Sequence, residues 1–118
     1  MLLMNLKTQK FNDEFVKIKP IIYQRDKWEC MYEVYGKYYF FYIERHSPKL
    51  TVDHIIPRSM PDLTSNKKEN LITLCPVCHN EFTNMPLERK VKILREIMTK
   101  AYGYKYEDRF TKLGITFG

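Results

Sequence analysis

The chain has 118 residues, of which 44% are hydrophobic and 29% charged, a composition typical of a globular domain and not of a disordered chain. Lysine and arginine number 20 against 14 acidic residues, and the net charge of +6 favours a polyanionic partner. The apolar run at the N-terminus is too short for a signal peptide or a membrane span. We therefore expect an intracellular, cytoplasmic protein with no membrane partner, in which cysteines favour metal binding, catalysis or burial over disulfides.

The first third of the chain is predicted to contain helical segments followed by a hairpin. Apolar spacing predicts a short helix over 11–18, which Pro20 should interrupt before a second helical piece over 21–28. Residues 30–43 are rich in aromatic and β-branched side chains, and Gly36 marks a turn near their middle. This pattern predicts a β-hairpin.

The rest of the chain is predicted to form a strand–loop–strand–helix unit and a final helix. Strands are expected over 50–55 and 70–75, joined by the polar loop 58–69. Pro76 suits the first turn of a helix over 76–83, and an apolar stripe predicts a last helix over about 86–101. The order of elements indicates an α+β fold.

Four polar residues in the strand–loop–strand–helix unit could form one catalytic site: Asp53, His54, Asn70 and His79. Regular strand geometry points the side chains of Asp53 and His54 to opposite faces, so convergence requires the strand to end, twist or bulge near Pro57. This set suits phosphodiester hydrolysis. A carboxylate and an imidazole can hold Mg²⁺, Mn²⁺ or a similar ion, while a second, neutral histidine takes a proton from water. An asparagine can orient that base or complete the metal shell.

Cys75 and Cys78 form a C-x-x-C pair at the start of the predicted helix. Two thiolates at this spacing can bind one Zn²⁺. Neighbouring helical residues project about 100° apart, so Cys78 can face a zinc ion while His79 faces another site. A thiol–disulfide site is the competing interpretation, but the predicted elements do not alternate as a βαβ unit.

Two segments, LTVDHIIPRS and ENLITLCPVCHNEFT, in this order resemble the HNH endonuclease family, the ββα-metal nucleases. In addition, QRDKWEC at 24–30 is similar to the segment that often precedes the family's first cysteine pair. The resemblance implies a small single HNH domain over 1–118. Its ββα-metal core would lie at about 50–83, with an N-terminal helix and hairpin before it and a C-terminal helix after it.

The resemblance also implies a role for each candidate residue. His54 would be the general base, Asp53 and His79 would bind the catalytic divalent cation, and Asn70 would orient the base or join the metal shell. The implied activity is hydrolysis of DNA phosphodiester bonds. A non-catalytic, zinc-stapled nucleic-acid-binding module and a zinc-stapled interaction domain without DNA affinity are the alternatives.

The sequence departs from the family at the first cysteine pair, where residues 30–33 read C-M-Y-E. The expected structural zinc ligands are Cys30, Cys75 and Cys78. Glu33 or His46 would supply the fourth ligand, since both carboxylates and imidazoles bind zinc. In the alternative without zinc, the aromatic hairpin packs where a metal would be.

Basic residues flank the candidate site and could contact phosphates. In the polar loop they are Arg58, Lys67 and Lys68, for which a solvated surface is the alternative. In the last helix they are Arg89, Lys90, Lys92 and Arg95, which form either a solvated face or an extension of the DNA track. Targeting is expected to come from a homodimer, from a protein partner or from weak sequence specificity.

Overall fold

The computed structural model describes residues 2–36, 43, 46–60 and 63–107, with side chains described from residue 7 onward. Its elements, in chain order, are α1 (Leu2–Arg25), α2 (Met31–Tyr35), β1 (Thr51–His54), the 3₁₀ helix η1 (Lys68–Asn70), β2 (Leu71–Leu74), α3 (Pro76–Thr83) and α4 (Leu87–Tyr102). The expected α+β class is confirmed, and the strand–loop–strand–helix unit has the predicted order.

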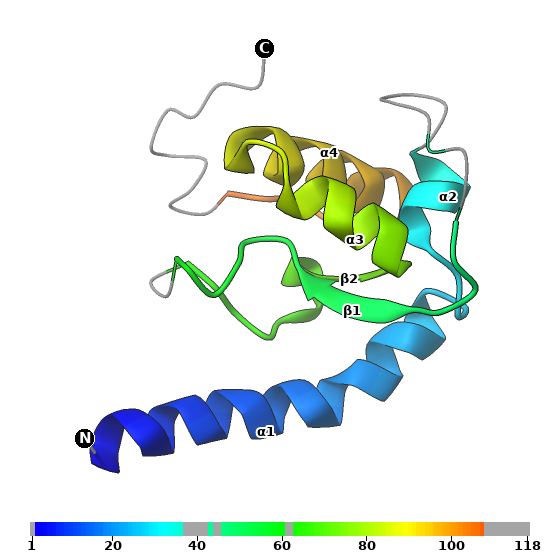
Figure 1. Ribbon diagram of the computed structural model, residues 1–118. Helices are drawn as coiled ribbons and strands as arrows, with labels where there is room; N and C mark the ends of the chain where they lie inside the picture. The colour runs from blue at the N-terminus through cyan, green and yellow to red at the C-terminus, as the bar shows by residue number, and fades with distance from the viewer. Residues whose placement is uncertain (1, 37–42, 44–45, 61–62, 108–118) are drawn as a thin grey trace.

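A two-stranded hairpin lies at the centre of the fold, with helices on both of its faces (Figure 1). β1 and β2 are antiparallel, and Asp53 pairs with Ile72 while His54 pairs with Leu71. One face packs Ile72 and Leu74 against the helices α2, α3 and α4. The other face packs Val52 and Leu71 against Ile22 of α1. Residues 53 and 54 therefore belong to different layers, because side chains alternate along a strand.

The helix α4 follows the predicted apolar stripe. Val91, Leu94, Ile97 and Met98 are buried in the larger core cluster. The helix ends at Gly103, whose φ of 71° lies in the left-handed region and whose N–H donates to the Thr99 carbonyl at 2.8 Å. Glycine adopts this terminating conformation more readily than other residues. The helix was predicted over about 86–101 and is observed over Leu87–Tyr102.

The N-terminal helix corrects one prediction, because α1 continues through Pro20 as a single helix. Proline removes one backbone hydrogen bond from a helix interior but does not always end the helix. Here side chains on both sides of Pro20 pack against the hairpin, including Phe15 and Ile22, and this packing holds the two halves together. Among the described residues, no helix combines the length and apolar character needed to cross a membrane.

The predicted hairpin over 30–43 is also wrong in its first half, because Met31–Tyr35 form the helix α2. Tyr32 is fully buried and packs edge-on against Phe82, with ring centroids 5.2 Å apart. Gly36 has a φ of −118° and serves close packing, since a Cβ there would lie 2.5 Å from the Tyr32 ring and 2.9 Å from Ile97. Tertiary packing thus overrides local β propensity. The second predicted strand lies mostly outside the described residues.

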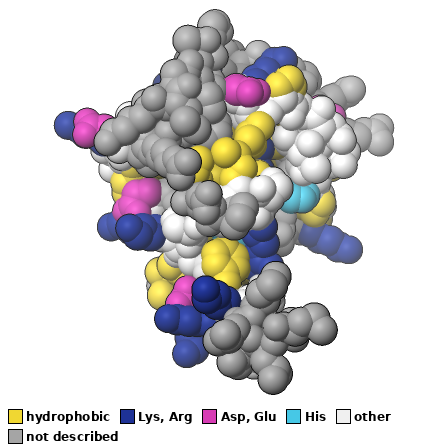
Figure 2. All heavy atoms as spheres, turned by 90° about the vertical axis from the view of Figure 1, so that its left-hand side faces the viewer, with side chains coloured by type: hydrophobic (Ala, Val, Ile, Leu, Met, Phe, Trp, Pro, Cys, Tyr) yellow, Lys and Arg dark blue, Asp and Glu magenta, His cyan; other side chains and the backbone are white. Residues whose placement is uncertain are grey.

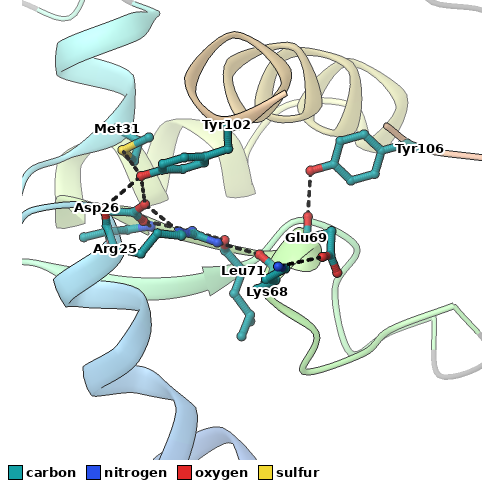
Figure 3. Close-up of polar contacts among 9 residues, drawn as sticks. Arg25, Asp26, Met31, Lys68, Glu69, Leu71, Tyr102 and Tyr106 are labelled. Atoms are coloured by element: carbon teal, nitrogen blue, oxygen red, sulfur yellow. Dashed lines mark hydrogen bonds and ion pairs between the residues drawn. The ribbon is translucent and has the colours of Figure 1, made fainter. Parts of the chain in front are cut away.

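A buried polar network around Asp26 ties the end of α1 to the hairpin and to α4 (Figure 3). Asp26 is 2% exposed, and its carboxylate accepts hydrogen bonds from Arg25 at 2.8 Å, from the Thr73 backbone N–H at 3.0 Å and from the Tyr102 hydroxyl at 2.5 Å. The Arg25 guanidinium also donates to the Leu71 carbonyl at 2.6 Å. Burial raises the pKa of Tyr102, so its hydroxyl stays a donor. The network fixes α1 against the hairpin.

Replacing Asp26 with alanine is expected to lower the free energy of unfolding by about 3 to 5 kcal/mol. The change leaves Arg25, the Thr73 N–H and the Tyr102 hydroxyl without their shared acceptor in a buried place. Urea denaturation followed by circular dichroism measures the effect. Asp13, which is exposed on α1, provides the control, and Asp13→Ala should change stability little. Equal stability of the two variants would contradict the prediction.

Candidate functional site

The first part of the candidate site is the pair Asp53 and His79, which join β1 to α3. The side chain of Asp53 points to the face of the hairpin that α3 covers, and its Oδ2 lies 3.1 Å from Nδ1 of His79. Both atoms are shielded from solvent, and neither forms a hydrogen bond with any residue that the structure describes. Two atoms that commonly bind metal ions therefore face each other, and the Lys90 ammonium group lies 3.7 Å from the carboxylate oxygen.

The spacing of this pair fits a divalent cation. Two ligand atoms about 2.1 Å from one octahedral ion, and at right angles to each other, lie about 3.0 Å apart. The observed 3.1 Å between the carboxylate oxygen and the imidazole nitrogen agrees with that value. The side chain of His79 is 44% exposed, so the remaining positions of such an ion could be reached by water or a phosphate.

His54 lies on the opposite face of the hairpin, against α1. It is 7% exposed, and its ring packs on Phe15 with centroids 4.5 Å apart and on Phe11 at 5.4 Å. The strand keeps its regular alternation through residues 53 and 54, with no bulge between them. The structure therefore does not bring the side chains of Asp53 and His54 together into one layer.

A hydrogen bond to Asn66 fixes the tautomer of His54. Oδ1 of Asn66 lies 2.8 Å from Nε2 of His54, while Nδ2 of Asn66 donates to the Phe11 carbonyl at 2.9 Å. Because the amide nitrogen is used by Phe11, the amide oxygen faces the imidazole, and Nε2 must carry the hydrogen. Burial lowers the pKa of His54, which favours the neutral ring. The neutral ring then carries its free lone pair on Nδ1.

Asn70 shapes the loop that follows β1. Its Oδ1 accepts from the Ile56 N–H at 2.9 Å, and its Nδ2 donates to the carbonyl groups of Ser65 at 3.0 Å and Ile56 at 3.3 Å. Among the described residues, its side-chain hydrogen bonds thus close the segment between residues 56 and 65. That segment leads directly to Asn66, and the Asn70 carbonyl also accepts a hydrogen bond from the Ile55 N–H at 2.8 Å.

A second cluster gathers Cys30, His46, Cys75 and Cys78 between α2 and α3. One ligand atom from each residue lies within 4.8 Å of the others. The Sγ atoms of Cys30 and Cys78 are 3.5 Å apart, and Nδ1 of His46 lies 3.3 Å from Cys78 Sγ and 3.6 Å from Cys75 Sγ. Ligand atoms in a tetrahedral zinc site are about 3.5 to 3.8 Å apart. The Cys₃His set therefore fits zinc.

His46 rather than Glu33 completes this cluster. The nearest carboxylate oxygen of Glu33 lies 3.9 Å from Nδ1 of His46, and its side chain is 45% exposed. The imidazole of His46 is 9% exposed and faces the thiols. The two buried sulfur atoms share a proton, and their hydrogen bond lowers the pKa of Cys30 and raises the pKa of Cys78. Metal ligands must be deprotonated, so a bound metal ion would have to displace the shared proton.

Of the three basic candidates between β1 and β2, Arg58 contacts the aromatic cover of His54. The Arg58 guanidinium stacks over the Phe11 ring at 4.6 Å, while Lys67 and Lys68 are exposed. Figure 2, which faces the left-hand side of Figure 1, shows Lys and Arg side chains among hydrophobic ones, with a histidine side chain reaching the surface. In α4, the prediction that Lys90 and Arg95 belong to an exposed basic surface is wrong, because both side chains are buried.

Two residues near the site have contacts with it that were not predicted from the sequence. Asn66 was interpreted only as part of a polar loop, and no sequence pattern indicates that its side chain contacts His54. Lys90 offered a detectable signal, because it lies three residues after Leu87 and four before Leu94, on the apolar stripe of α4. A single charged residue on a buried stripe requires a partner.

Residues 39–84 match the family model described as HNH endonuclease. No curated protein and no solved structure matches the chain. The resemblance to the HNH endonuclease family is thus confirmed over this range, which includes Asp53, His54, Asn70 and His79. An HNH domain implies a nuclease-type function, nucleic-acid binding and the use of a divalent metal ion.

Proposed function

We propose that this protein is a divalent-metal-dependent endonuclease that hydrolyses DNA phosphodiester bonds. The observation that carries the proposal is the shielded contact of 3.1 Å between Asp53 Oδ2 and His79 Nδ1, within the matched range. A net charge of +6 supports a polyanionic substrate. Arg58, Lys67 and Lys68 are the proposed phosphate contacts, since they are exposed and lie between β1 and β2.

Each residue of the site has a proposed task. Asp53 and His79 bind the divalent cation, which when bound supplies positive charge for the phosphate and the leaving oxygen. His54 takes a proton from the attacking water through Nδ1, because Asn66 occupies Nε2. Asn70 holds the loop that carries Asn66. The base lies in a different layer from the metal ligands, so the substrate must approach the end of β1, where the two layers meet.

The Cys₃His cluster is proposed to hold a structural zinc ion. Its four ligands come from the segment after α1, the segment before β1 and the start of α3. A zinc ion there links α3, which carries His79, to the start of α2. The proposed zinc thereby fixes one of the two catalytic metal ligands without taking part in the reaction.

A non-catalytic nucleic-acid-binding module is the second candidate. The observation that favours it is the cover of Phe11 and Phe15 over His54, which leaves the imidazole 7% exposed. In this alternative His54 is a packed core residue held by Asn66. Such a module would bind DNA in a salt-sensitive manner but would not cleave it.

The test of the proposed function is the Asp53→Asn variant with supercoiled plasmid DNA and Mg²⁺ or Mn²⁺. We expect the wild type to nick or linearise the plasmid, and chelation to stop the reaction. The variant should bind Mn²⁺ at least about 100-fold more weakly, because it has lost a charged ligand, and should lose cleavage to a similar extent. Calorimetry and gel electrophoresis measure the two effects.

The matched control is Asp13→Asn, which removes an exposed carboxylate from α1 and should leave both properties unchanged. Thermal unfolding shows whether each variant is folded. Plasmid cleavage by the wild type at the background rate, with salt-sensitive DNA binding intact, would favour the non-catalytic module instead.

A further inference from the structure

Lys90 is a buried cation on the apolar stripe of α4, outside the range that matches the HNH family model. It is 6% exposed, while Val91 and Leu94 on the same helix are fully buried. Removing an ammonium group from water costs several kcal/mol unless charged or polar partners compensate. An apolar residue at this position would serve simple packing at lower cost.

Two contacts of the Lys90 ammonium group lie at the end of β1. Its Nζ donates to the His54 carbonyl at 3.1 Å and lies 3.7 Å from Oδ2 of Asp53. That oxygen is the one that faces His79 Nδ1 at 3.1 Å. One ammonium group therefore holds both the candidate metal ligand and the backbone of the candidate base.

The charges at this place oppose the entry of a cation. The Asp53 carboxylate carries one negative charge and Lys90 one positive charge, and a metal-bound His79 is neutral. The pair is thus electrically balanced before any ion enters. A divalent cation on Asp53 would lie close to the ammonium group, where like charges repel even at a high effective dielectric constant. A phosphodiester adds a negative charge and offsets this repulsion.

We propose that Lys90 is a positioning residue that makes divalent-metal binding at Asp53 and His79 weak in the free protein and stronger when a phosphodiester is present. The inference rests on the proposed metal site and adds regulation to it. Lys90 holds the Asp53 carboxylate in place in the metal-free state and links metal binding to substrate binding. The protein would then carry little bound metal ion at this site until DNA arrives.

The experiment measures Mn²⁺ affinity by calorimetry on the full chain, saturated with zinc, without DNA. Lys90→Met is expected to bind Mn²⁺ about tenfold more tightly than the wild type, because the positive charge is removed. Lys90→Gln also removes the charge but keeps a donor for the His54 carbonyl. It should also bind Mn²⁺ more tightly than the wild type, and it replaces Lys90→Met in the test if that variant does not fold. Lys90→Arg keeps the charge and should bind as the wild type does. Lys100→Met, on the exposed end of α4, is the matched control and should have no effect.

A second measurement uses the wild type alone. Its Mn²⁺ affinity should rise about tenfold on addition of a short duplex with phosphorothioate linkages, which resist cleavage. Weaker or unchanged Mn²⁺ binding by folded Lys90→Met and Lys90→Gln would overturn the proposal, since a purely structural lysine gives that result. So would the absence of measurable Mn²⁺ binding in every protein. Tighter Mn²⁺ binding by the variants, together with a wild type that does not cleave DNA, would support the proposed role of Lys90 and reject the proposed nuclease function.

Discussion

Replacing His46 with alanine is expected to prevent binding of the proposed zinc ion and to lower the melting temperature by more than about 10 °C. His46 Nδ1 lies within 3.6 Å of two of the three cysteine sulfur atoms, and its imidazole is nearly buried. Without it, three thiols would remain around an incomplete site. Because the cysteines lie in the main core cluster, loss of the ion should loosen α2 and α3 together. Metal analysis and thermal unfolding measure both effects.

Glu33→Gln is the matched control for the fourth ligand. Glu33 was the other candidate, but its carboxylate lies 3.9 Å from His46 and is largely exposed. We expect this variant to retain one equivalent of zinc and a nearly unchanged melting temperature. Zinc loss in Glu33→Gln with full retention in His46→Ala would reverse the assignment. Purified wild-type protein with well below one equivalent of zinc would reject the zinc site altogether.

Replacing His54 with glutamine is expected to lower the rate of DNA cleavage about 10² to 10⁴-fold, the usual contribution of a general base. Glutamine can still donate a hydrogen bond to Oδ1 of Asn66, so the buried amide keeps a partner, but it cannot accept a proton from water. The substitution therefore separates the chemical role of His54 from its place in the core. Single-turnover cleavage of a labelled duplex measures the rate.

Metal binding provides the control for this variant. His54→Gln should bind Mn²⁺ as the wild type does, because Asp53 and His79 are unchanged, whereas Asp53→Asn should not. Circular dichroism and thermal unfolding should give nearly wild-type curves. A folded His54→Gln variant that cleaves DNA at the wild-type rate would contradict the base assignment. Another group would then have to accept the proton.

Local patterns predicted the central unit of the fold well. Short segments rich in apolar residues, separated by a polar loop, identified β1 and β2, Pro76 marked the first turn of α3, and the spacing of apolar residues located α4. These signals depend on residues close in sequence, so they are readable without the fold. The two errors, at Pro20 and at Met31–Tyr35, occur where packing against distant elements outweighs a local preference.

The candidate site was predictable only in part for the same reason. The types and order of Asp53, His54, Asn70 and His79 indicated phosphodiester chemistry, and Cys75 with Cys78 indicated a metal site. Their spatial relations could not be read from the sequence. Asn66 reaches His54 across a loop, and Lys90 reaches Asp53 from a helix 37 positions later.

By itself, the sequence determined the set of chemical groups and the local elements that carry them, because residue type and periodicity act over short distances. Only the tertiary structure decided which groups meet. It kept β1 regular through Asp53 and His54, so the two side chains stay on opposite faces without the bulge that convergence required. It selected His46 over Glu33 for the cysteine cluster and brought the buried Lys90 to the end of β1, because core packing fixes where distant helices contact the hairpin.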